Sequence, residues 1–98
     1  MSQPLVTVLM PVYNAAAYVA GAAESILAQT YTDFEFVIVD DGSTDGTTAI
    51  VERYAARETR VVLTRNKTNQ GLVRSLNRGL SMARGRFLAR QDADDLSY

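Results

Sequence analysis

The 98-residue sequence predicts an α/β fold, with a parallel four-stranded sheet in the order 3-2-1-4 and helices on both faces. Two observations lead to this prediction. Short apolar, β-branched runs alternate with longer segments in which apolar residues recur every three or four positions. Each connection between two strands is also long enough to hold a helix, as a crossover between parallel strands requires. The expected rhythm is β-α-β-α-β-α-β, within one small domain.

Four segments are predicted to be strands. The first, residues 5–10, is almost wholly apolar, which is typical of a strand buried on both faces, and Pro11 is expected to end it. The second strand is expected at 34–39, the third at 60–64 and the fourth at 86–90.

Three helices are predicted between these strands. The first is expected over residues 15–29, where the apolar side chains form one stripe. The second carries Ile50 and Tyr54 on its apolar side. The third begins at Leu72, after a polar loop, and closes near Gly85.

The composition excludes several kinds of chemistry. The chain has no cysteine, so disulfides, thiolate nucleophiles and cysteine-based zinc sites are excluded. It also has no histidine, which removes the commonest general base. Any metal must therefore be held by oxygen ligands, which favours Mg²⁺ or Mn²⁺. Neither a P-loop nor a G-x-G-x-x-G motif is present, so we expect a metal rather than a glycine-rich loop to hold phosphate.

The charges are unevenly distributed along the chain. Residues 1–52 hold seven acidic residues and no basic one, and all ten basic residues lie between Arg53 and Arg90. This pattern fits an arginine-rich helix surface, and it also fits a basic flank that faces phosphate or a partner. Aromatic residues do not interleave with the basic ones, so a nucleic acid is not an expected partner.

The sequence leads to expectations about the cellular location of the protein and about the domain to which residues 1–98 belong. The longest apolar run is too short to span a bilayer, and no signal-peptide pattern precedes it. We expect a cytoplasmic protein, with membrane association only through segments outside residues 1–98. A sheet that ends after its fourth strand has an exposed edge. We therefore expect residues 1–98 to be a truncated N-terminal part of a larger domain, able to form homo-oligomers through this edge or an apolar surface.

Polar groups follow three of the predicted strands, at residues 11–14, 40–43 and 92–95. Because parallel strands all point the same way, these groups should gather at the carboxyl edge of the sheet. Ligands of open α/β sheets bind at this edge, where the strand order reverses. The sequence therefore predicts one crevice surrounded by Tyr13, Asp41 and the acidic cluster.

Asp92 and Asp94 lie one residue apart, so both carboxylates can bind one hard cation, or one can bind the cation and the other a ribose hydroxyl. A bound metal would stabilise a diphosphate leaving group. A solvated acidic turn is the alternative. At Asp40, Asp41 and Gly42, a carboxylate could accept a hydrogen bond from a nucleotide base while glycine allows close approach. A turn with a helix cap explains these residues equally well.

Tyr13 has two interpretations of its own. It could be a core aromatic at the end of a strand, or it could stack on a base at the same edge.

Six segments together resemble the opening of family 2 glycosyltransferases of the GT-A fold, whose first half is Rossmann-like. The resemblance rests on residues 8–14, 25–31, 36–45, 69–71, 76–80 and 83–95. It covers nearly the whole chain, in the family's order and spacing. It implies a metal-dependent, inverting glycosyltransferase that uses a nucleotide-diphosphate sugar, most often a UDP-sugar.

The resemblance also implies roles for individual residues. Pro11, Tyr13 and Asp41 would line the pocket for the base and ribose, and Asp40 would support the adjacent turn. For the metal the resemblance implies that Asp94 ligates Mn²⁺ or Mg²⁺, with Asp92 near the ribose or the metal.

The general base of such an enzyme would be a carboxylate from the family's second half, to which nothing here corresponds. The acceptor, whether saccharide, lipid or protein, is also not determined. We therefore expect these residues to form only the donor-binding half, inactive alone.

Three alternative functions make different demands on the sequence. A response-regulator receiver would need acidic residues after the first and third strands, where this chain has none. A nucleotidyltransferase would have a glycine-rich basic loop after the first strand, which is also missing. A nucleotide-binding or protein-interaction module of the same fold, without transferase activity, is the remaining alternative.

Overall fold

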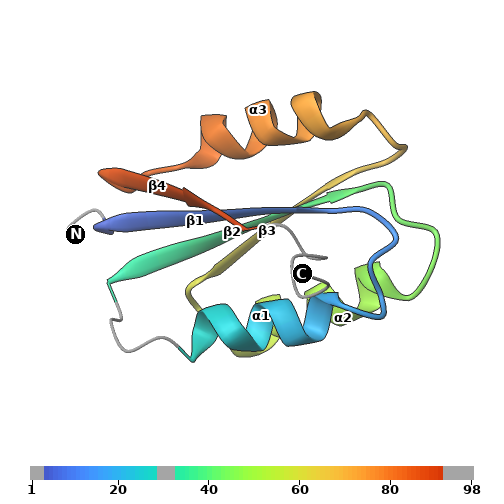
Figure 1. Cartoon of the computed structure of the whole chain (residues 1–98), viewed down its shortest axis with the longest axis horizontal. Coiled ribbons are helices and arrows are strands. Elements are labelled where there is room, and N and C mark those ends of the chain that lie inside the picture. Colours follow the sequence, from blue (N-terminus) through green and yellow to red (C-terminus); the bar gives the residue numbers. More distant parts are fainter. Residues whose placement is uncertain (1–3, 29–32, 92–98) are drawn as a thin grey trace.

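The computed structural model describes residues 4–28 and 33–91. Its elements follow the order β1 (Val6–Val12), α1 (Val19–Leu27), β2 (Phe34–Asp41), α2 (Thr47–Arg57), β3 (Val61–Asn66), α3 (Leu72–Met82) and β4 (Phe87–Arg90). All four strands are parallel and lie in the order β3-β2-β1-β4 (Figure 1). The predicted fold class and strand order are therefore confirmed.

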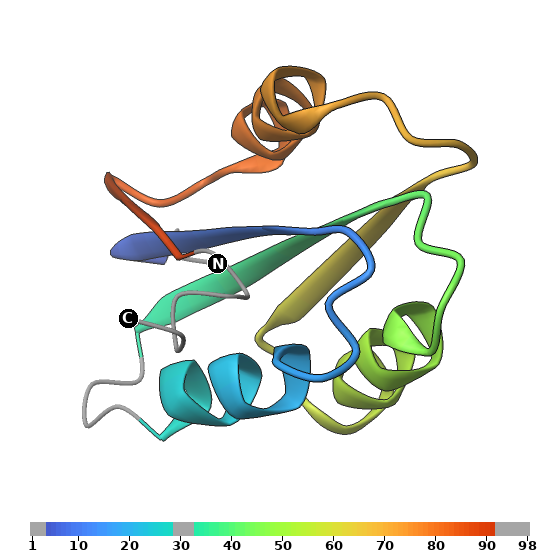
Figure 2. The same cartoon turned by 45° about the vertical axis from the view of Figure 1, so that its right-hand side comes forward.

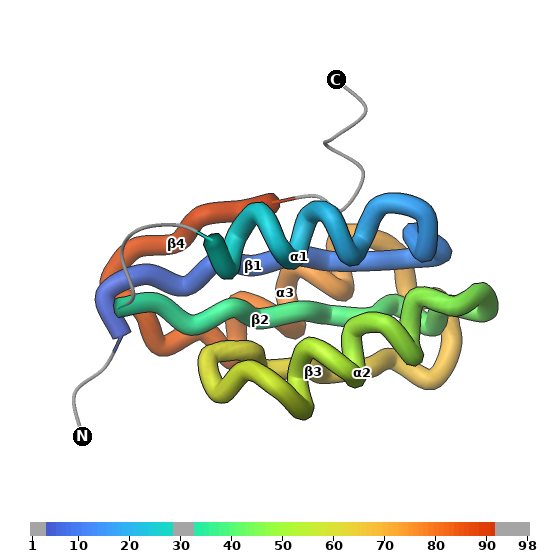
Figure 3. Tube along the Cα trace, turned by 90° about the horizontal axis from the view of Figure 1, so that it is seen from below, coloured from blue at the N-terminus to red at the C-terminus, as the bar shows by residue number. Residues whose placement is uncertain are grey.

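The helices lie on both faces of the sheet. Helices α1 and α2 cover one face and α3 covers the other, with the sheet between them (Figure 2). On their shared face, α1 and α2 run side by side (Figure 3). None of the described helices is long and apolar enough to cross a membrane.

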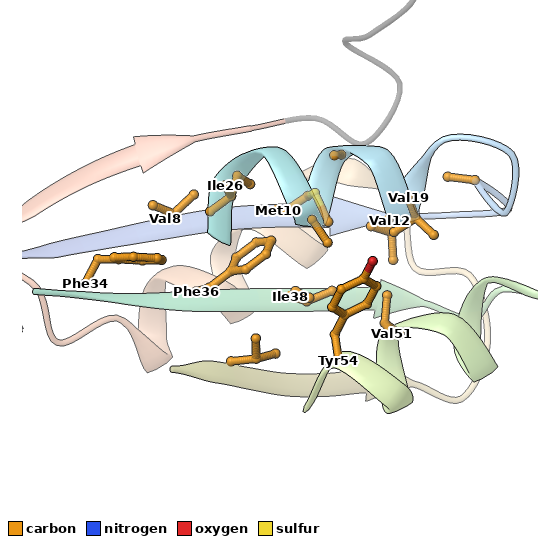
Figure 4. Close-up of a cluster of buried hydrophobic side chains, with 14 residues drawn as sticks. Val8, Met10, Val12, Val19, Ile26, Phe34, Phe36, Ile38, Val51 and Tyr54 are labelled. Atoms are coloured by element: carbon orange, nitrogen blue, oxygen red, sulfur yellow. The ribbon is translucent and has the colours of Figure 1, made fainter. Parts of the chain in front are cut away.

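The core is divided between the two faces because successive strand residues point to opposite sides. On the α1/α2 side, Val8, Met10, Phe36 and Ile38 pack against both helices, and the buried ring of Tyr54 closes the cluster (Figure 4). The side that faces α3 holds a smaller cluster. It consists of Leu9, Val37 and Val39, with Val62, Leu76 and Met82 packed against them.

The prediction that Pro11 ends the first strand was wrong, because β1 continues to Val12. Leu9 accepts a hydrogen bond from the Gln91 N–H, so its polar backbone groups face β4. Pro11 lies two residues further along β1, so its nitrogen points to the same side as the Leu9 backbone groups. The pairing of β1 with β4 ends at Leu9, so no residue of β4 pairs with Pro11. Its missing N–H therefore breaks no hydrogen bond of the β1–β2 ladder.

The first helix begins later than predicted, at Val19 instead of residue 15. Asn14 has a positive φ of 48°, which takes the chain out of the strand direction. A turn follows, in which the N–H groups of Tyr18 and Val19 both bond to the Ala15 carbonyl. The chain needs this turn to cross from the sheet edge to the face where α1 packs.

A hydrogen-bonded cluster of Thr7, Glu35, Arg84 and Gly85, in which Thr7 and Glu35 are buried, connects the end of α3 to the sheet; it is called the Glu35 cluster below. Glu35 Oε2 accepts from the Thr7 hydroxyl at 2.6 Å and from the Arg84 N–H at 2.5 Å. The Arg84 guanidinium lies 3.1 Å from Oε1, and the Gly85 N–H donates to Thr7 Oγ1. Burial raises the pKa of Glu35, but these hydrogen bonds and the Arg84 charge outweigh burial and hold the pKa below its usual value of 4.5.

Candidate functional site

The carboxyl ends of β1, β2 and β3 meet at one edge of the sheet, on the right in Figure 1. The strand register places Val12 opposite Asp40, and Asp41 opposite Asn66. Both aspartates are thus the last residues of a strand rather than part of the loop that follows. A rigid ladder positions them, which suits a binding site better than a mobile loop.

Asp41 is a buried carboxylate, 4% exposed, surrounded by hydrogen-bond donors. Its Oδ1 accepts from the Asn66 side chain at 2.9 Å and from the Gln70 N–H at 2.7 Å. Its Oδ2 accepts from the Gly71 N–H at 3.0 Å. Asp41 therefore connects the end of β2 to the end of β3 and to the start of α3.

The surroundings of Asp41 keep it ionised. Burial raises the pKa of this carboxyl, but the hydrogen bonds from Asn66, Gln70, Gly71 and the Ser75 hydroxyl together outweigh burial and lower the pKa below its usual 3.8. At neutral pH Asp41 can therefore accept a hydrogen bond but cannot donate one.

A pocket of about 210 Å³ opens beside Asp41, between the end of β1 and the start of α3. Its lining consists of Pro11, Val12, Tyr13, Asp41, Asn69, Gly71, Leu72 and Ser75. Three of the predicted site residues, Pro11, Tyr13 and Asp41, thus line the same pocket. Tyr13 is half exposed, at 49%, so part of its side chain is accessible to a ligand. The pocket combines an ionised carboxylate with largely apolar walls and is called the Asp41 pocket below.

Asp40 and Gly42 contribute to the turn beside this pocket and do not line it. Asp40 is fully buried, and its Oδ1 accepts from the Ser43 N–H at 3.1 Å. The Arg65 guanidinium lies 3.8 Å from Oδ2. Gly42 has a φ of 73°, and an added Cβ would come within 2.6 Å of the Thr68–Asn69 backbone. The backbone of the neighbouring loop thus fills the space beside Gly42. The predicted role of Gly42 in the close approach of a ligand stays a prediction.

Sequence reasoning did not identify Asn14, Asn66 or Ser75 as site residues. The Asn14 Oδ1 accepts from the N–H groups of Thr44 and Asp45, which ties the loop after β1 to the loop after β2. Asn66 and Ser75 are buried polar residues beside Asp41, and the Asn66 amide donates to the Ser75 hydroxyl at 3.2 Å. Ser75 carried a usable signal, since it interrupts the apolar stripe of the third helix.

The predicted metal ligands Asp92 and Asp94 lie outside the described residues. The structure therefore describes neither the metal site nor the predicted position of Asp92 near a ribose. β4 ends at Arg90, two positions before Asp92 in the sequence. Between residues 4 and 91, apart from 29–32, no group of three or more acidic side chains could hold a metal ion. The metal site therefore remains a prediction.

Comparison with known proteins gives consistent results. The sequence model of one family, described as Glycosyl transferase family 2, matches residues 7–98. The chain is 49% identical over 98 residues to EpsE of Bacillus subtilis (strain 168), whose name places it among glycosyltransferases; the match covers 99% of this chain and 35% of EpsE. The chain thus spans about a third of the length of that relative.

Several solved structures share its fold, including those of PcManGT and TarS. The mannosyltransferase PcManGT from Pyrobaculum calidifontis, in complex with GDP-Man and Mn²⁺, has a TM-score of 0.85 and 34% identity. That match covers 96% of this chain and 28% of PcManGT. S. aureus TarS 1-349, in complex with UDP-GlcNAc, has a TM-score of 0.85 and 33% identity, covering 92% of this chain and 26% of TarS.

Proposed function

The chain belongs to glycosyl transferase family 2, and on that premise we propose that it forms the donor-binding part of a glycosyltransferase that uses a nucleotide-diphosphate sugar. The observation that carries the proposal is the Asp41 pocket, in which an ionised carboxylate and a half-exposed tyrosine flank the same space. The structural relatives support it, because their complexes contain GDP-Man and UDP-GlcNAc.

The chemistry of the pocket matches a nucleotide base. A base has flat apolar faces, which pack against Tyr13 and Pro11, and a polar edge. Asp41 is ionised and can only accept, so it favours a base edge that carries an N–H. Uracil has such a group at N3. Guanine carries N–H groups at N1 and N2 as well, so the pocket chemistry admits both bases. Following the family resemblance, we propose a UDP-sugar as the donor, with GDP-sugars as the alternative to be tested.

We further propose that Asp94 and Asp92 hold Mn²⁺ or Mg²⁺. Carboxylate oxygens are the ligands that these hard cations prefer, and the Mn²⁺ bound with GDP-Man in PcManGT supports a metal at a donor site of this fold. Such a metal would neutralise the donor diphosphate and stabilise it as a leaving group. The residues of this chain would bind and orient the nucleoside.

The transfer itself needs a further group. In an inverting displacement, the acceptor hydroxyl attacks the anomeric carbon as the nucleotide diphosphate leaves, and a carboxylate general base takes the hydroxyl proton. We propose that this base and the acceptor site lie outside residues 1–98, in the remaining length that the relatives have. The alternative is a nucleotide-binding or protein-interaction module without transferase activity.

Calorimetry of UDP and GDP with the purified protein tests the donor and the metal together. Each nucleotide is titrated with Mn²⁺ and then with a chelator, into the unsubstituted protein, Asp94→Asn and Asp33→Asn. Asp33 is an exposed acid at the opposite end of β2 and serves as the charge-matched control. We expect UDP to bind more tightly with Mn²⁺, and only Asp94→Asn to lose that gain.

Equal UDP affinity in all conditions would contradict the metal bridge but leave the pocket in place. No binding of either nucleotide would contradict the proposed donor function. Tighter binding of GDP than of UDP would overturn only the choice of base.

A further inference from the structure

A second pocket lies next to the Asp41 pocket, between the end of β3 and α3, with a volume of about 280 Å³. Its lining consists of Asn66, Lys67, Gln70, Arg74 and Arg78, and it is called the basic pocket below. Three of these five side chains are cationic, two are amides and none is acidic. A space lined this way is suited to a negatively charged ligand.

The cations of the basic pocket are not neutralised by the protein. Arg57, Arg60, Arg65 and Arg84 each lie within 4.0 Å of a carboxylate. Among the described residues, Lys67, Arg74 and Arg78 have no such partner. Of the five described cations without a carboxylate partner, three thus line this pocket, while Arg53 and Arg86 lie elsewhere.

Arg78 is also held in place by hydrogen bonds, and both arginines of the pocket keep unused donors. The Arg78 Nη1 donates to Asn66 Oδ1 at 2.6 Å and to the Arg65 carbonyl at 3.4 Å. Arg74 lies four residues earlier in α3, so the two side chains share one face of the helix. Each guanidinium has five N–H groups and no acceptor, so most of these groups remain available to a ligand.

We propose that the basic pocket binds a phosphate group, carried either by a soluble molecule or by a lipid headgroup. Phosphate offers several acceptor oxygens and close to two negative charges, which suits three neighbouring cations. Two N–H groups of an arginine guanidinium can donate hydrogen bonds to two phosphate oxygens at once. A single neutral or positively charged group would leave the three cations uncompensated.

The basic pocket is separate from the proposed donor site. The two pockets have no lining residue in common, and neither Tyr13 nor Asp41 lines the basic one. They do share a wall, because Asn66 and Gln70 both donate to Asp41. Because no lining residue is common to both pockets, phosphate binding can nevertheless be tested separately from donor binding.

An NMR titration of the ¹⁵N-labelled protein with inorganic phosphate, at constant ionic strength, tests the proposal. Constant ionic strength matters because salt screens exposed charges. We expect saturable shifts at the amides of Lys67, Gln70, Arg74 and Arg78. The double variant Lys67→Gln/Arg74→Gln should bind phosphate about tenfold more weakly or worse, because it loses two charged donors.

This variant should fold normally, since it keeps the bond between Arg78 and Asn66. Lys67 makes no hydrogen bond within the described residues, and Arg74 makes only a long, exposed one to Gln70, at 3.5 Å. The control Arg53→Gln/Arg86→Gln removes the same charge outside the basic pocket and should leave phosphate binding unchanged.

Vesicles distinguish the two sources of the phosphate group. If the source is a lipid headgroup, the protein co-sediments with phosphatidylglycerol vesicles but not with phosphatidylcholine vesicles, and the pocket variant loses this binding. If the source is soluble, phosphate alone produces the shifts. The proposal is overturned if neither probe binds, if shifts spread over all exposed basic residues, or if the control variant loses as much binding as the pocket variant.

Discussion

Asp41 is a charged residue in a buried position, and its hydrogen-bond donors offset the free-energy cost of burying the charge. A buried carboxylate without partners would have a raised pKa and would be neutral. Here Asn66, Gln70 and Gly71 surround it, so it stays charged and its direction is fixed. The same donors that stabilise the fold therefore prepare an acceptor at the edge of the Asp41 pocket.

Asn66→Ala should destabilise the protein by about 1–2 kcal/mol, since it removes a buried donor to a charged group and the acceptor of Arg78. The pKa of Asp41 should rise toward its usual value. Urea denaturation followed by circular dichroism measures the first effect, and NMR titration of the carboxyl carbon the second. Asn77→Ala on the exposed face of α3 is the control, and an equal loss in both variants would contradict the assigned role.

At this scale, sequence reasoning located the carboxylate but not its partners. Asp41 and Tyr13 could be predicted because each follows a recognisable strand, and parallel strands bring their ends together. Asn66 and Ser75 come from different elements, and their meeting depends on how α3 crosses the sheet. Local sequence patterns do not determine such a contact, because it arises from packing.

Among the elements, the connection from α3 to β4 is tightly constrained. A Cβ added at Gly85 would come within 2.4 Å of the Thr7 nitrogen and 2.6 Å of the Val6 carbonyl carbon. Both atoms belong to the backbone of β1, which the paired strands β2 and β4 hold on either side. The hydrogen bonds of the Glu35 cluster hold the same connection against β1 and β2. The position at which β4 begins therefore depends on the close packing of Gly85 against β1.

Gly85→Ala should therefore cost about 1–3 kcal/mol of stability through overpacking. The matched control is Gly46→Ala, where an added Cβ would meet only the Ala16 Cβ at 3.9 Å. Thermal denaturation of both variants measures the difference. If the Gly85→Ala protein were as stable as the Gly46→Ala protein, the connection would accommodate the added Cβ without cost, which would contradict the predicted overpacking.

The elements themselves were predictable from periodicity, whereas several of their ends were not. Strands β1, β2 and β3 each run two residues past their predicted ends, into Val12, Asp41 and Asn66. Pairing between strands continues there although the residues include proline and polar side chains. Hydrogen bonds to a neighbouring strand, which a single segment does not reveal, decide where a strand stops.

For the whole molecule, two buried carboxylates link stability to pH. Asp41 and Glu35 both have a pKa that is lower in the folded protein than the usual 3.8 and 4.5. A group with a lowered folded pKa stabilises the fold above its unfolded pKa, and this contribution is lost as the pH falls through the folded value. The free energy of unfolding should thus begin to fall below about pH 4.5 and continue to fall below 3.8.

Glu35→Gln should lower the free energy of unfolding by about 2 kcal/mol at pH 7, since it replaces a charged acceptor by a neutral one. It should also make the decline below pH 4.5 shallower than in the unsubstituted protein. Glu52→Gln, at an exposed position on α2, is the control and should change neither. Urea denaturation at a series of pH values shows both effects, and parallel curves for all three proteins would contradict the role of Glu35.

We propose that the Asp41 pocket, formed where strand ends and α3 meet, holds the base of the donor nucleotide. Tyr13 and Tyr18 provide a matched test, because both lie between β1 and α1 and are 49% and 45% exposed, while only Tyr13 lines the pocket. Titration of UDP into Tyr13→Ala and Tyr18→Ala, with Mn²⁺ present, measures the contribution of each ring. We expect Tyr13→Ala to weaken UDP binding about tenfold or more through lost stacking, and Tyr18→Ala to leave it unchanged. Equal affinities for the two variants would contradict the proposal.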